Sequence, residues 1–207
     1  INCHPSDINL DIVKYIKNNL NTILTEPPKG IEIIINNFIK EGYQDRIFDP
    51  VKQELTSFGK TLRQLFNYKG FRGSKKALWF AKNFGIMSCT TCNTQFMLTT
   101  IRGGEEKMLF HLDHYFPQGV YPYLSLSYFN LIPSCANCNM GKSNKAFTLL
   151  ENIHPYIESF HDLAKFKLDK TSIVDFLVNP NNDSKKIKYN VQLRAKYIGN
   201  KNYEKKL

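Results

Sequence analysis

The fold is decided by the stretch Cys135-Ala-Asn-Cys138-Asn139-Met-Gly-Lys142 and by an earlier counterpart, Cys89-Thr-Thr-Cys92. In a Cys-x-x-Cys pair a tight turn brings both sulfurs to one side, and two pairs complete the tetrahedral shell of a zinc ion. Because four thiolates leave no open position, such a zinc would be structural. The alternative is a set of incidental buried thiols. The gap between the pairs is too long for an ordinary zinc ribbon, so a folded segment must lie between them.

Further polar residues stand around the two pairs in a regular order. Asp113-His114 ends a strand-like stretch, Asn130-Leu131 precedes the second pair, and Asn139 directly follows it. Each is weak evidence alone, because an Asp-His pair at a strand end is more often structural and a single Asn is often a loop or helix cap. Their order around two predicted zinc knuckles favours one shared site.

This pattern resembles the HNH endonuclease family, which has a ββα-metal fold. The matching elements cover roughly residues 85–150 and are Cys89, Cys92, Asp113-His114, Asn130-Leu131, Cys135, Cys138-Asn139 and Gly141-Lys142. By the resemblance, Asp113 and Asn139 match the ligands of a catalytic divalent cation and His114 matches the general base. Asn130 matches the central Asn, which holds the loop that orients the histidine. The family often has His where this chain has Asn139, although Asn also occurs there, so the difference bears on metal preference.

Elementary chemistry is consistent with these roles. A neutral imidazole near its ordinary pKa can accept a proton from water at pH 7. A carboxylate and an amide oxygen are hard ligands, which suit Mg²⁺ or Mn²⁺ better than the zinc expected at the cysteines. The zinc knuckle would hold the helix that carries Asn139 against the strand that carries Asp113. The resemblance implies products with a 5′-phosphate and a 3′-hydroxyl.

Neighbouring residues allow more than one interpretation. Lys142 and Lys145 follow Asn139 closely, so they could bind phosphates of the nucleic acid, or they could lie on a solvated helix face. His111 precedes Asp113 by two, and we interpret it as an exposed strand histidine rather than a phosphate or metal contact. The aromatic stretch from residue 115 to 129 is more typical of core packing than of base stacking. Cys3 is interpreted as an unpaired thiol.

The flanking regions predict an α+β protein with a mostly helical N-terminal region. Apolar residues at helical spacing predict helices from a cap at Ser6 to residue 24, over 31–39, from Asp49-Pro50 to residue 66, and from a cap at Ser74 to residue 84. Strands are predicted over 94–101 and 107–116, and a helix from Asn139 or Met140. Alternation over 187–193 indicates a further strand. We therefore divide the chain into a helical region (1–84), an HNH nuclease region (85–150) and an extension with a basic tail (151–207).

Charge and composition narrow the class of partner. The chain has 207 residues and a formal net charge of +10, which favours an anionic partner such as nucleic acid. No apolar run is long enough for a transmembrane helix, and the first 30 residues show no signal peptide. Paired cysteines without a secretion signal indicate a reducing, cytoplasmic location. Numbering begins at Ile1 rather than Met, so residues could precede it.

The sequence therefore predicts a metal-dependent HNH nuclease that acts on DNA, with RNA as the alternative substrate. The flanks also resemble the HNH partner proteins of bacterial antiphage systems of the Septu and retron type, in which the nuclease associates with an ATPase. Restriction, homing and phage nucleases are alternatives within the same class. Outside it, the alternatives are a catalytically silent zinc-stapled nucleic-acid-binding module and a regulatory subunit of a larger complex. The silent module would not need Asp113, His114, Asn130 and Asn139 together.

Overall fold

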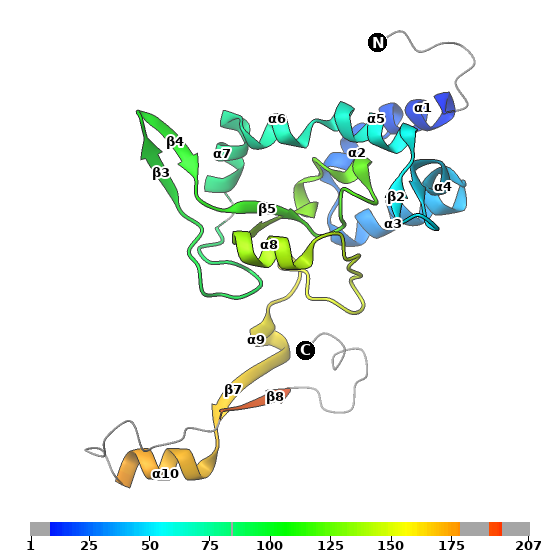
Figure 1. Ribbon diagram of the computed structural model, residues 1–207. Helices are drawn as coiled ribbons and strands as arrows, with labels where there is room; N and C mark the ends of the chain where they lie inside the picture. The colour runs from blue at the N-terminus through cyan, green and yellow to red at the C-terminus, as the bar shows by residue number, and fades with distance from the viewer. Residues whose placement is uncertain (1–8, 84, 179–190, 196–207) are drawn as a thin grey trace. The chain divides into compact units, whose positions relative to one another are not determined.

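The computed structural model describes residues 9–83, 85–178 and 191–195, and its helices and small antiparallel sheets confirm the predicted α+β class (Figure 1). The chain forms two compact units, Ile1–Thr148 and Leu149–Leu207. The first unit combines residues 1–84 with most of the segment that resembles HNH proteins. The three-region division made from the sequence stays a prediction.

The N-terminal part of the first unit is helical. Ile12, Ile16 and Ile23 are buried along one face of its first two helices, as the apolar spacing predicts. Ser74 caps the last of these helices by accepting a hydrogen bond from the Ala77 N–H. The helices are α1 (Leu10–Asn18), α2 (Leu20–Thr25), α3 (Pro28–Lys40), α4 (Tyr43–Ile47), α5 (Ser57–Phe66), α6 (Tyr68–Arg72) and α7 (Lys75–Lys82).

The helix predicted to start at Asp49-Pro50 starts later. Asp49 instead accepts hydrogen bonds from the next backbone N–H groups, Val51 and Lys52, and these close a turn between strands β1 (Phe48–Asp49) and β2 (Glu54–Leu55). The N-cap of α5 is Thr56, whose side chain accepts from the Gly59 N–H. The prediction failed because an Asp side chain can accept backbone hydrogen bonds in a turn as well as at the N-terminus of a helix.

Two four-residue strand pairs follow in the first unit. Strand β3 (Thr99–Arg102) pairs with β4 (Glu105–Met108) across the turn at Gly103 and Gly104, both of which have positive φ. Strand β5 (His111–His114) pairs with the distant β6 (Leu131–Ser134). The single strand predicted over 107–116 is therefore wrong. The chain changes partner around Phe110, which turns into the core and is 3% exposed.

The core of the first unit has two centres. One surrounds strands β5 and β6 and contains Phe80, Cys89, Met97, Phe110, Leu112, Leu131 and Cys135. The other joins α3 to the connection between the strands, where the Phe38 and Tyr123 rings stack with centroids 3.9 Å apart. In that connection, which contains the 3₁₀ turns η1 (Pro122–Leu124) and η2 (Tyr128–Asn130), Tyr115, Phe116 and Tyr123 are buried. Their burial supports the packing interpretation of the aromatic stretch.

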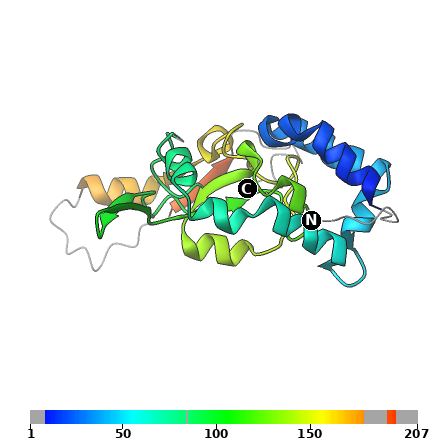
Figure 2. The same ribbon diagram turned by 90° about the horizontal axis from the view of Figure 1, so that it is seen from above.

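The views in Figures 1 and 2 agree on how the elements of the first unit lie. The β3–β4 hairpin lies at the opposite end of the unit from α1 to α4, and α8 (Ala136–Lys142) runs beside β5. The arrangement places β5, β6 and α8 at the middle of the unit.

Gly59 on α5 is required by close packing, because a Cβ there would lie 2.1 Å from the Ile47 carbonyl oxygen.

The second unit has α9 (Phe160–Leu163), β7 (Ala164–Leu168), α10 (Lys170–Val178) and β8 (Val191–Ala195). Strands β7 and β8 are antiparallel. The end of the strand predicted over 187–193 falls in β8, whereas residues 187–190 lie outside the described part. So do most of the basic tail, the predicted cap Ser6, and Cys3.

Candidate functional site

The second cysteine pair lies where β6 passes into α8. Cys135 has an extended backbone and is the N-cap of α8, because its sulfur accepts a hydrogen bond from the Cys138 N–H at 3.4 Å. The helix therefore begins at Ala136, and the predicted start at Asn139 or Met140 is wrong. The error arises because a cysteine is rarely a helix cap, and here the knuckle geometry gives it that role.

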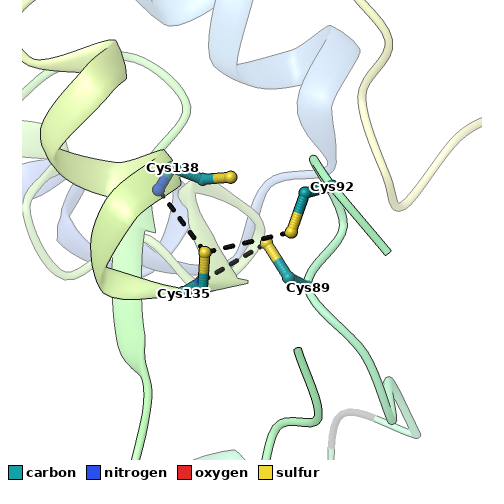
Figure 3. A group of neighbouring side chains, drawn as sticks. All are labelled: Cys89, Cys92, Cys135 and Cys138. Atoms are coloured by element: carbon teal, nitrogen blue, oxygen red, sulfur yellow. Dashed lines mark hydrogen bonds between the residues drawn. The ribbon is translucent and has the colours of Figure 1, made fainter. Parts of the chain in front are cut away.

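The four paired cysteines converge from two distant segments (Figure 3). Their sulfurs all lie within 4.8 Å of one another, and the Cys92 and Cys135 sulfurs are 3.9 Å apart. A tetrahedral zinc with Zn–S bonds of ~2.3 Å needs sulfurs about 3.8 Å apart. The residues Cys89, Cys92, Cys135 and Cys138 thus form a cluster that could hold zinc, as predicted.

Backbone hydrogen bonds favour thiolate at the first pair. Burial raises the pKa of Cys89, but hydrogen bonds from backbone N–H groups, including that of Cys135 at 3.3 Å, outweigh burial and lower the pKa to about 6. A backbone hydrogen bond at Thr94 lowers the pKa of Cys92. Burial and neighbouring sulfurs raise the pKa of Cys138. Because cysteine binds a metal as the thiolate, a bound cation would displace the proton from the Cys138 thiol.

His114 lies at the end of β5 with its ring buried. Its Nε2 lies 3.0 Å from the Ser125 carbonyl oxygen, and this contact requires Nε2 to carry the proton. The other ring nitrogen, Nδ1, is then an acceptor. Burial lowers the pKa of His114 to about 4, so the imidazole is neutral at pH 7. The sequence predicted a neutral ring, although with a pKa near its ordinary value.

Asn130 is fully buried and joins the two ends of the connection between β5 and β6. Its Oδ1 accepts from the Phe116 N–H at 2.7 Å, and its Nδ2 donates to the Phe116 and Leu124 carbonyls, each at 3.0 Å. The Tyr115 N–H donates to the Asn130 carbonyl. Asn130 thus holds the segment that follows His114, which is the contact the family resemblance implies. Its catalytic importance stays a prediction.

Asp113 and Lys142 form an ion pair between β5 and α8. The Lys142 Nζ lies 3.5 Å from Asp113 Oδ1 and donates to the His114 carbonyl at 2.5 Å, with the Lys142 side chain only 8% exposed. Lys142 also lies over the Phe147 ring. The interpretation as a solvated helix face is therefore wrong for Lys142. Burial favours the neutral form of each partner, because it raises the pKa of Asp113 and lowers the pKa of Lys142.

Asn139 points from α8 toward β5. Its Nδ2 lies 3.0 Å from Nδ1 of His111, which is exposed as predicted. Lys145 follows the helix and is exposed, and its backbone N–H donates to the Lys142 carbonyl. The structure thus brings Asp113, Asn139 and Lys142 together where α8 meets β5 and leaves Lys145 on the surface.

Tyr68 on α6 is a contact of this site that sequence reasoning missed. Its hydroxyl donates to the Leu112 carbonyl at 2.6 Å, and its ring meets the His114 ring edge-on with centroids 4.4 Å apart. Burial raises the pKa of Tyr68 to about 12. A single tyrosine far from the motif carries no local signal, because only packing of α6 on β5 brings it there.

Comparison with known proteins adds one partial match. The chain is 43% identical over 51 residues to protein ea31 of Escherichia phage lambda, a match that covers 23% of this chain and 17% of the phage protein. No protein-family model and no solved structure matches the chain. Across the described residues, none of the helices combines the length and the apolar character needed to cross a membrane.

Proposed function

We propose that the chain is a metal-dependent HNH endonuclease that hydrolyses phosphodiester bonds in DNA, with β5, β6 and α8 as its ββα core. One observation carries the proposal: a buried, neutral histidine, His114, has one nitrogen committed to a backbone carbonyl and the other left as an acceptor. It directly follows Asp113 at the end of β5, and the Lys142 ammonium contacts both residues, through the Asp113 carboxylate and the His114 carbonyl. One-metal phosphodiester hydrolysis requires a proton acceptor and a hard oxygen ligand in one site.

His114 accepts a proton from the attacking water through Nδ1. The Ser125 carbonyl holds the opposite side of the ring, and Tyr68 packs against it, so the orientation of the ring is set before substrate binds. In the substrate-free protein the pKa of about 4 makes His114 a weak base. The negative charge of a phosphodiester beside the ring raises that pKa and so strengthens the base.

Asp113 and Asn139 offer a carboxylate and an amide oxygen from facing elements, a donor set that fits Mg²⁺ or Mn²⁺. When bound, that cation supplies a Lewis acid for the phosphate and the leaving oxygen. Lys142 neutralises Asp113 when no cation is present. Its flexible chain can instead turn its ammonium to a phosphate, and the exposed Lys145 can bind a flanking phosphate.

The four cysteines have a separate, structural task in this proposal. A zinc ion bound by Cys89, Cys92, Cys135 and Cys138 joins the start of α8 to the segment before β3. Since Asn139 directly follows the last ligand, the zinc fixes the helix that presents it. The proposal includes a cytoplasmic location, RNA as the alternative substrate and, from the resemblance of the flanks, action with an ATPase partner in antiphage defence.

A catalytically silent zinc-stapled module is the second candidate. The observation in its favour is the Asp113–Lys142 pair, because a buried ion pair can also be purely structural. Such a module would bind nucleic acid without cleaving it. A regulatory subunit of a larger complex would likewise bind without cleaving.

Cleavage and metal binding of single variants separate these candidates. The purified zinc-loaded chain is incubated with plasmid and single-stranded DNA, with and without Mg²⁺ or Mn²⁺, and Mn²⁺ binding is measured by calorimetry. We expect His114→Ala to keep Mn²⁺ binding and to lose ~10²–10⁴-fold in cleavage rate. Asp113→Ala should lose both, since the charged ligand is gone.

The matched controls are His161→Ala and Asp45→Ala, which remove exposed side chains of the same types from α9 and α4. Both should cleave at the wild-type rate. Wild-type cleavage by His114→Ala contradicts the mechanism. DNA binding by the wild type without cleavage under any metal condition favours the silent module or the regulatory subunit.

A further inference from the structure

The contact between His111 and Asn139 joins β5 to α8 at the edge of the proposed cation site. His111 and Asp113 are two residues apart on the same strand, so their side chains leave the same face. Asn139 and Lys142 are three residues apart on α8 and therefore also share a face. Asn139 meets His111, and Lys142 meets Asp113. Both contacts join α8 to β5.

The donor and acceptor roles in this contact follow from the chemistry of the two groups. The Asn139 amide nitrogen can donate hydrogen bonds but cannot accept them. The His111 Nδ1 that faces it at 3.0 Å must therefore be the acceptor. The His111 proton then resides on Nε2. Since the Nδ1 lone pair is used by the amide, it is not available as a metal ligand.

The orientation of the amide matters because only its oxygen binds a hard cation. A primary amide can present either end by a half turn about its last bond. With Nδ2 committed to His111, Oδ1 is on the opposite side of the amide and is available to a ligand. A carboxamide without such a partner would spend part of its time with the NH₂ group, which repels a cation, in that place.

We propose that His111 is a positioning residue, which accepts a hydrogen bond from Asn139 Nδ2 and so fixes the amide with Oδ1 toward a divalent cation. This inference rests on the proposed function. It gives a role to an exposed histidine that the nuclease motif does not include. It also explains how the neutral amide of Asn139 can act as a dependable ligand, because its partner on β5 holds it in one orientation.

Mn²⁺ affinity of the zinc-loaded full chain tests the proposal. We expect His111→Ala to weaken Mn²⁺ binding about tenfold, the usual effect of losing a partner of a metal ligand. Zinc content and melting temperature should stay unchanged, because His111 is exposed. His111→Asn should restore the affinity, since its Oδ1 stands at the same distance from the backbone as Nδ1 and accepts the same hydrogen bond. His111→Leu should not. His161→Ala is the matched control.

Pulsed electron paramagnetic resonance of bound Mn²⁺ distinguishes positioning from direct ligation. We expect no imidazole nitrogen coupling that depends on His111. Wild-type affinity in His111→Ala, equal affinities in His111→Asn and His111→Leu, or a nitrogen coupling that disappears in His111→Ala would each overturn the inference and leave the proposed function standing. If the wild type and Asp113→Ala bind Mn²⁺ equally, the cation site itself is wrong and the inference falls with it.

Discussion

Two strand pairs of equal length, β3–β4 and β5–β6, differ in how far their residues are exposed to solvent. In the first pair almost every residue is exposed, and Ile101 is 72% exposed. In the second, all four residues of β6 are buried. The first is closed by a two-glycine turn, whereas the second is closed by a long connection held at Asn130 and by the cysteine cluster.

The difference shows which of the two strand pairs can hold a side chain in one orientation. A local hairpin needs only its own turn to form. Glu106 of β4 does pair with Lys82 on α7, and Met108 packs against the core, but most side chains of the two strands are exposed. His114, on the second pair, is fixed by Ser125 from the connection and by Tyr68 from α6. Contacts from distant parts of the chain remove rotational freedom from the ring, which is what the proton acceptor of the proposed mechanism needs.

Loss of the zinc site should destabilise the β5–β6 strand pair more than the β3–β4 pair. Cys135→Ser removes one of four ligands, and because metal binding is part of the folding free energy, we expect several kcal/mol of destabilisation. Elemental analysis and thermal melting measure it. Cys3→Ser, at the cysteine outside the two pairs, is the control and should keep its zinc. A metal-free Cys135→Ser that melts at the wild-type temperature would show that the cluster is not a structural zinc site.

Removal of the Asn130 amide should open the connection between β5 and β6. Asn130→Ala removes the hydrogen bonds that the Asn130 amide makes to the N–H and the carbonyl of buried Phe116, and one of the two donors to the Leu124 carbonyl, so we expect about 3 kcal/mol of destabilisation in denaturant unfolding. Cleavage should fall less than in His114→Ala, because Asn130 supports the geometry rather than the chemistry. Asn83→Ala, at an exposed helix end, is the matched control. Equal stabilities of the two variants would mean that Asn130 does not hold the connection.

Acid should destabilise the protein through His114. Its folded pKa of about 4 lies below the ordinary value of 6.5, so the unfolded chain binds more protons between those values. The stabilisation is complete above pH 6.5 and is lost as pH falls toward 4, with about 2 kcal/mol lost by pH 5. The measurement compares melting of the wild type and His114→Gln, which cannot titrate there. Parallel pH profiles would contradict the assignment.

The smallest effect is expected in the exposed strand pair. Ile101→Ser changes a side chain with little buried surface, so we expect a change within about 0.5 kcal/mol in denaturant unfolding, and wild-type cleavage. A loss comparable with that of Asn130→Ala would show that the β3–β4 hairpin is covered in solution, and the contrast between the two pairs would disappear.

Local chemistry in the sequence determined several parts of this protein. The spacing within each cysteine pair predicts a knuckle, because only neighbouring residues are needed to form it, and the four sulfurs do meet. Ser74 was recognisable as a helix cap for the same reason. The order of the polar residues around the knuckles led to the nuclease interpretation, which stays a prediction.

Only the tertiary structure decided which partners the polar residues meet. The break in the predicted strand at Phe110 follows from the packing of Phe110 against core residues from other segments, and the burial of Lys142 depends on how α8 packs along β5. The meeting of His111 with Asn139 depends on the same packing. Periodicity reports which face of an element is apolar, but contacts between distant segments depend on the angle and register at which the elements pack. These are set by the shape of the whole core.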